Sequence, residues 1–186
     1  MPPSITPNAT VFMACVDFLL MDELKLLQGR FKQSFEVSSS FGPSVLEGAW
    51  HGPSLMDSLD EVDLGQAVAR PIEGRHTIRE ITIHCAFWME EVDGALHGRE
   101  MVSVESIEDW PNVETAEDWV GDLERLRSVY EGLARSIVSL DPADLENTIG
   151  SHFGENYHLF TYRKTLHGIS DHNLYHAGQI SILKRK

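Results

Sequence analysis

Nine histidines occur in this sequence of 186 residues, and His172 and His176 are the only two that lie four residues apart. On an α-helix this spacing places both imidazoles on one face, about 6 Å apart along the axis. Two imidazoles in that arrangement can bind one divalent cation. Because nine histidines can also produce one such pair by chance, the spacing indicates a metal site only if a third ligand joins the pair.

His84 is the candidate for that third ligand. It lies on the apolar face of a segment whose start is marked by Thr77 and Glu80, the Thr-x-x-Glu pattern of a helix capping box. A polar group on an apolar face costs stability unless it is hydrogen-bonded or bound, and a core histidine bonded to a backbone carbonyl would meet that requirement. If His84 instead meets His172 and His176 inside a bundle, the three leave a coordination position open for water or substrate.

Two polar side chains share the helix turns of the histidine pair. Gln179 lies three residues after His176, so its amide could orient a metal ligand or a bound water, and it could equally bridge neighbouring helices. Tyr175 lies three residues after His172 and could supply a phenol. We expect instead a buried tyrosine whose ring packs in the core and whose hydroxyl is hydrogen-bonded.

Several other residues that could do chemistry have simpler interpretations. Cys85 points about 100° away from the histidine that precedes it on a helix, so we expect it in the core. Glu90 and Glu91 could act as general bases, but both are predicted to be exposed carboxylates. His51 and His76 are predicted to serve in a loop or a helix cap rather than as metal ligands.

Helices must position these residues, because apolar residues recur at intervals of three and four and sustained alternation is rare. We predict four long helices, over about residues 10–35, 77–94, 115–140 and 159–183. The second begins at the Thr77 cap and the third at a cap formed by Thr115 and Asp118, while Pro53 suits the first turn of a short helix. We therefore expect an all-α fold, a four-helix bundle with long crossover connections, in one domain over residues 1–186.

The chain is strongly acidic, with 15 Lys and Arg residues against 29 Asp and Glu residues and a formal net charge of -14. Such a charge disfavours binding to nucleic acid or to an anionic membrane surface. Most of the excess lies in residues 89–124, which we interpret as a solvated connection with exposed helix faces or as an electrostatic filter near a site. Two cysteines, no signal peptide and no apolar run of about 20 residues favour a cytoplasmic protein.

Three stretches of the sequence resemble the DinB-like superfamily, and they occur in that family's order. The closing stretch, Asp171 to Ile180, is similar to the family's C-terminal signature of the His-x-x-Tyr-His-x-Gly-Gln type, which supplies two metal ligands. The segment that contains His76, His84 and Trp88 resembles its second-helix pattern, and Trp50 to Leu55 resembles a stretch common in one branch. The resemblance implies a four-helix bundle with long crossovers and frequent homodimerisation.

The resemblance also implies that His84, His172 and His176 hold a divalent metal ion. Zinc and nickel are the ions expected first, although imidazole also suits copper and iron. The implied protein is a metal-dependent thiol transferase or hydrolase, in which a low-molecular-weight thiol or a water is activated to attack a small-molecule substrate. Two alternatives stay open: a noncatalytic metal-binding bundle that binds a small molecule or a protein, and a role on DNA, which the charge disfavours.

Overall fold

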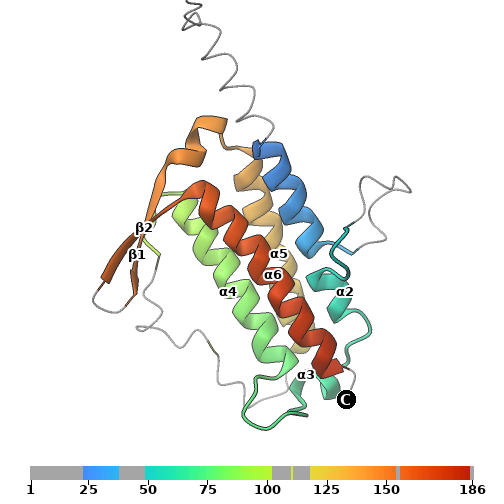
Figure 1. Cartoon of the computed structure of the whole chain (residues 1–186). Coiled ribbons are helices and arrows are strands. Elements are labelled where there is room, and N and C mark those ends of the chain that lie inside the picture. Colours follow the sequence, from blue (N-terminus) through green and yellow to red (C-terminus); the bar gives the residue numbers. More distant parts are fainter. Residues whose placement is uncertain (1–22, 38–48, 102–109, 111–117, 154–155, 185–186) are drawn as a thin grey trace, which may run out of the picture.

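The computed structural model describes residues 23–37, 49–101, 110, 118–153 and 156–184 (Figure 1). Four long helices lie side by side in it, at residues 23–35, α4 (Ile78–Leu96), α5 (Trp119–Val138) and α6 (Tyr162–Lys184). The predicted all-α four-helix bundle is confirmed. The part of the first predicted helix before residue 23 lies outside the described residues, as does Thr115 of the predicted third cap.

Apolar side chains from all four helices meet in one core. Its members include Leu27 and Phe31 from the first helix, Ile81 from α4, Leu133 from α5 and Ile180 from α6. Each of these side chains is almost completely buried. At three- and four-residue spacing along each helix, they form the apolar faces that hold the bundle together.

The start of α4 follows the predicted capping box. The Thr77 hydroxyl accepts a hydrogen bond from the backbone N–H of Glu80 at 3.1 Å, and the Glu80 carboxylate accepts one from the backbone N–H of Thr77 at 2.7 Å. Two backbone donors that a helix start leaves free are thereby satisfied. The cap fixes where α4 begins, and it therefore fixes the turn on which His84 lies.

A crossover with two short helices connects the first helix to α4. These are α2 (Leu55–Leu59) and α3 (Leu64–Val68), and α2 packs against α6. The prediction that Pro53 lies in the first turn of this short helix was wrong, because Pro53 precedes the N-cap. Ser54 is the N-cap of α2, because its side chain accepts a hydrogen bond from the backbone N–H of Asp57, and Pro53 lies outside the helix.

A β-hairpin precedes α6, which the sequence did not predict. Strands β1 (Thr148–Phe153) and β2 (Asn156–Thr161) pair antiparallel, with Thr148 opposite Thr161. The last helix consequently begins at Tyr162 rather than near residue 159, and the Thr161 hydroxyl accepts a hydrogen bond from the backbone N–H of Lys164. The hairpin lies beside the start of α6 (Figure 1) and forms one wall of a cavity described below.

Among the residues that the structure describes, no helix combines the length and the apolar character that crossing a membrane requires. The longest, α6, carries three charged residues in its first and last turns and a histidine pair between them. The acidity of the chain is partly neutralised between helices. Arg79 of α4 donates to the carboxylate of Asp122 on α5 at 2.5 Å, and Arg125 of α5 contacts Glu90 of α4 at 2.7 Å.

Candidate metal centre

Three histidines converge between α4 and α6. The Nε2 atom of His172 lies 3.1 Å from Nε2 of His84 and 3.1 Å from Nε2 of His176. The ring nitrogens that the three could offer to an ion all lie within 4.8 Å of one another. His84 and His176 are buried, and His172 is half-buried. The structure thus brings together all three residues that the sequence predicts as a metal site.

Neutral imidazoles cannot satisfy one another in this arrangement, because each ring nitrogen carries either one proton or one lone pair. Nε2 of His172 can form a well-directed hydrogen bond with only one of its two neighbours, which leaves the other 3.1 Å contact without a directed hydrogen bond. Two nitrogens that are each about 2.1 Å from one ion, about 95–110° apart, lie about 3.1–3.4 Å from each other. The observed spacing and the all-nitrogen donor set therefore fit a divalent metal ion.

Gln179 fixes the orientation of one of the three rings. Its Oε1 atom lies 2.8 Å from Nδ1 of His176 and accepts the Nδ1 proton, so the Nε2 lone pair of His176 faces the other histidines. This bond favours the interpretation in which Gln179 orients a histidine over the one in which it bridges neighbouring helices. Nδ1 of His172 is buried and has no hydrogen-bond partner among the described residues.

Burial keeps His172 and His176 neutral. It lowers the pKa of His172 to about 3, and repulsion from the neighbouring His176 and His84 adds to the effect. It also lowers the pKa of His176 to about 4, against the opposing effect of the hydrogen bond to Gln179. Both rings are therefore uncharged near pH 7, which is the state in which an imidazole can bind a metal ion.

Aromatic rings cover the centre. The indole of Trp110 lies parallel to the ring of His84, with centroids 3.9 Å apart, and its other face stacks on His76 at 3.5 Å. Trp88 meets the edge of His84 at 6.3 Å. The sequence did not single out Trp110 as a site residue, although an aromatic residue within the acidic crossover was a signal for it. The crossover therefore reaches the histidines at this residue.

Two cavities flank the centre along α6. The first, which we call the hairpin cavity, has a volume of about 250 Å³ and an almost entirely apolar lining of α4, α6 and hairpin residues. Trp88, Phe160 and Ile169 line it, and so do Gly168 and His172. The second, which we call the Arg75 cavity, has a volume of about 340 Å³. Tyr175 and Gln179 of α6 line that cavity, so His172 and His176 lie between the two cavities along the helix.

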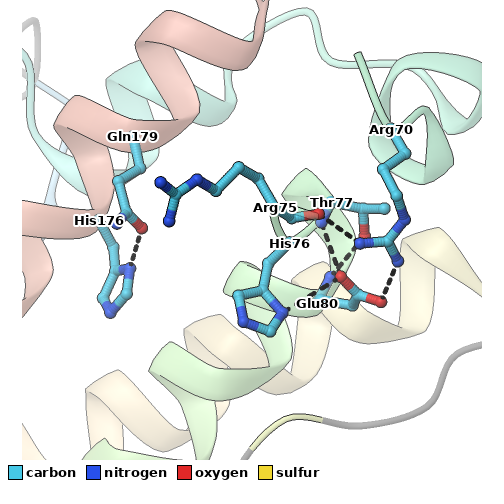
Figure 2. A network of polar contacts seen from close by, with 7 residues as sticks. All are labelled: Arg70, Arg75, His76, Thr77, Glu80, His176 and Gln179. Atoms are coloured by element: carbon cyan, nitrogen blue, oxygen red, sulfur yellow. Dashed lines mark hydrogen bonds and ion pairs between the residues drawn. The ribbon is translucent and has the colours of Figure 1, made fainter. Parts of the chain in front are cut away.

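A polar network borders the Arg75 cavity (Figure 2). Arg70 donates to Glu80 at 2.7 Å, and His76 lies 3.5 Å from the same carboxylate. Burial alone would raise the pKa of Glu80, but the bonds from Thr77 and Arg70 and the nearby charges lower it. Glu80 is therefore a fixed anion near pH 7, and its charge is already compensated.

Of the predictions for the remaining residues, some are confirmed and others are wrong. Cys85 is completely buried in the core as predicted, and burial raises the pKa of its thiol. Glu90 is exposed as predicted, but Glu91 is buried: Arg99 folds back across the helix and donates to its carboxylate at 2.5 Å. Tyr175 is 64% exposed rather than buried, because the Arg75 cavity opens beside its ring.

The two outlying histidines occupy the places expected of them. His51 is exposed in a turn before α2 and does not contribute to the cluster. His76 directly precedes the N-cap of α4 and stacks on Trp110. Cys15 lies outside the described residues.

Comparison with protein-family models matches residues 48–180 to a family described as the DinB superfamily. The match begins before α2 and ends within α6, so it contains His84, His172 and His176. Comparisons with curated proteins and with solved structures give no match.

Proposed function

Since this chain belongs to the DinB superfamily, we propose that it is a metal-dependent enzyme that transfers a low-molecular-weight thiol to an electrophilic small molecule. One observation carries the proposal: three imidazoles bring their ring nitrogens within 4.8 Å of one another, and Nε2 of His172 lies 3.1 Å from Nε2 of both His84 and His176. The proposed ligands are His84, His172 and His176.

The metal, with zinc or nickel expected first, would act as a Lewis acid that lowers the pKa of a bound thiol or water toward neutrality. The chain's own residues prepare that chemistry. Three neutral ligands leave the charge of the ion uncompensated, Gln179 holds His176 in the tautomer that binds, and Trp88 and Trp110 limit the access of bulk water.

The two cavities favour thiol transfer over hydrolysis, because a reaction between two organic molecules needs room on two sides of the centre. In the proposed reaction the thiol loses its proton to solvent, its sulfur bonds to the electrophilic carbon, and the leaving group departs with the electron pair of the broken bond. We propose that the hairpin cavity takes the apolar part of the electrophile. About 250 Å³ suits a single aromatic ring or a branched alkyl group, since an apolar cavity of about 150 Å³ holds benzene.

A turnover assay tests this proposal. The zinc- or nickel-loaded full chain is assayed with cysteine or N-acetylcysteine and 1-chloro-2,4-dinitrobenzene, and His172→Ala is expected to lose the catalysed rate. Turnover of 4-nitrophenyl acetate without thiol would favour hydrolysis instead. A loaded protein that catalyses neither reaction, with metal loss lowering only stability, would favour the noncatalytic metal-binding bundle.

A cavity-filling variant tests the place of the electrophile. A Cβ at Gly168 would meet no atom within 4 Å, so Gly168→Leu should fold normally and fill the hairpin cavity. We expect KM for the electrophile to rise at least about tenfold, with metal content unchanged. Gly29→Leu, at an equally open glycine of the first helix, is the matched control. Equal KM values in the two variants would show that the electrophile does not bind in this cavity.

A further inference from the structure

Arg75 is a cation without a counter-ion among the described residues, although the chain is strongly acidic. Except for Arg127, every other arginine among the described residues forms an ion pair with a carboxylate. Neither Arg75 nor Arg127 has a side-chain hydrogen bond or ion pair among those residues, but only Arg75 lines a cavity beside the histidines. With 29 acidic residues against 15 basic ones, pairing is the usual state of an arginine here.

The Arg75 side chain points away from the Glu80 carboxylate. Figure 2 shows Arg75 extending from the loop before α4 toward Gln179 and away from the ion pair of Arg70 with Glu80. Because Arg70, the Thr77 backbone and His76 already surround Glu80, that carboxylate does not neutralise Arg75. The guanidinium keeps its donors available on the side of the metal centre.

The cavity in front of Arg75 has the composition of a small-molecule site. Apolar side chains of Ile72, Ile81 and Leu183 line part of it, while the polar groups come from Arg75, His76, Tyr175 and Gln179. Mostly apolar walls with a few placed polar groups are typical of such sites. Gln179 belongs at once to this cavity and to the hydrogen bond that orients His176. A molecule bound here is therefore adjacent to the metal centre.

We propose that Arg75 binds the carboxylate of a substrate whose apolar part rests on the isoleucine side of this cavity. The inference deepens the proposed function, on which it rests, by assigning a carboxylate to one of the two reactants. A guanidinium matches a carboxylate with two parallel hydrogen bonds, and such charge-assisted bonds are the strong ones. A phosphate dianion would need further cationic partners, and among the described residues Arg75 is the only arginine that lines the cavity.

The experiment compares two probes that differ in charge but not in shape. Phenylacetate and phenylacetamide are titrated into the full-length protein, and dissociation constants are taken from amide chemical shifts. We expect phenylacetate to bind about tenfold more tightly than phenylacetamide. Arg75→Gln should bring the two constants within about twofold of each other, while Arg127→Gln, the other unpaired arginine, should leave the preference intact.

Three outcomes overturn the inference: equal affinities in the unmodified protein, a preference that survives Arg75→Gln, or no binding of either probe. Inorganic phosphate is titrated in parallel. If phosphate binds more tightly than phenylacetate and this binding depends on Arg75, the site recognises a phosphate group rather than a carboxylate, and the proposal is overturned. Because neither probe contains a thiol and no turnover is measured, failure of thiol transfer would leave this result unaffected, and the two failures are distinguishable.

Discussion

The Oε1 atom of Gln179 accepts the Nδ1 proton of His176 across 2.8 Å, and this bond determines which nitrogen of the ring faces the other two histidines. The two residues lie three positions apart on α6, so one helix supplies both the proposed ligand and the group that orients it. Hydrogen bonds of this kind hold a metal-binding histidine in one tautomer and raise its basicity.

Removing that bond should weaken metal binding without unfolding the protein. We expect Gln179→Ala to lower the metal affinity about 10- to 100-fold, because the Nδ1 proton of His176 loses its acceptor. Gln179→Glu, which keeps an acceptor oxygen, should retain the affinity or increase it. Competition with a chromophoric chelator measures both variants. An unchanged affinity in Gln179→Ala would show that Gln179 has no part in holding the ligand.

The histidine cluster could be predicted from the sequence because most of its determinants are local. The Thr77 capping box fixes the start of α4 and hence the turn of His84, and the four-residue spacing of His172 and His176 puts both on one face of α6. The residue spacing could not predict that α4 packs against α6. The family resemblance implied that His84 meets the other two histidines, and the 3.1 Å contacts show that the three lie together.

Features that depend on distant parts of the chain could not be predicted in this way. Trp110 reaches His84 from a crossover without periodicity, so no local pattern places it. Glu91 is buried because Arg99, eight residues later, neutralises it. The hairpin escaped prediction since β2 is mostly exposed and lacks the apolar alternation of a half-buried strand. Tyr175 would be buried only if another element covered that face of α6.

The Trp110 indole should slow the release of the metal. It covers one face of His84, so its removal opens the centre to water and chelators. We expect Trp110→Ala to be stripped of metal by EDTA about tenfold faster than the unmodified protein, with little change in thermal unfolding of the metal-free form. Trp50→Ala is the control, because Trp50 is 99% exposed. Equal stripping rates in both variants would contradict a covering role.

Acid should destabilise the metal-free protein between about pH 6.5 and 5. The pKa values of His172 and His176 are lowered in the fold to about 3 and about 4, so over this range the unfolded chain binds protons that the folded chain does not. Stability is therefore complete above the ordinary histidine pKa of about 6.5 and falls as the pH is lowered, approaching about 1.4 kcal/mol per pH unit for each histidine.

Urea unfolding of the metal-free protein at a series of pH values measures this slope. His172→Gln removes one of the two titrating groups. It should reduce the slope of the unfolding free energy against pH by the contribution of one histidine. His51→Gln, at an exposed histidine, should leave it unchanged. A free energy of unfolding that stays constant from pH 6.5 to 5 would mean that these rings take up protons as readily in the folded state as in the unfolded chain.

Metal stoichiometry tests the central claim most directly. Elemental analysis of the purified full chain, and of single alanine variants at His84, His172 and His176, gives the number of ions bound per chain, with His51→Ala as the matched control. We predict about one divalent ion per chain in the unmodified protein and in His51→Ala, and less than about a tenth of that in each of the other three. Unchanged metal content in the three cluster variants, or an unmodified chain that cannot be loaded with zinc or nickel, would contradict the metal centre.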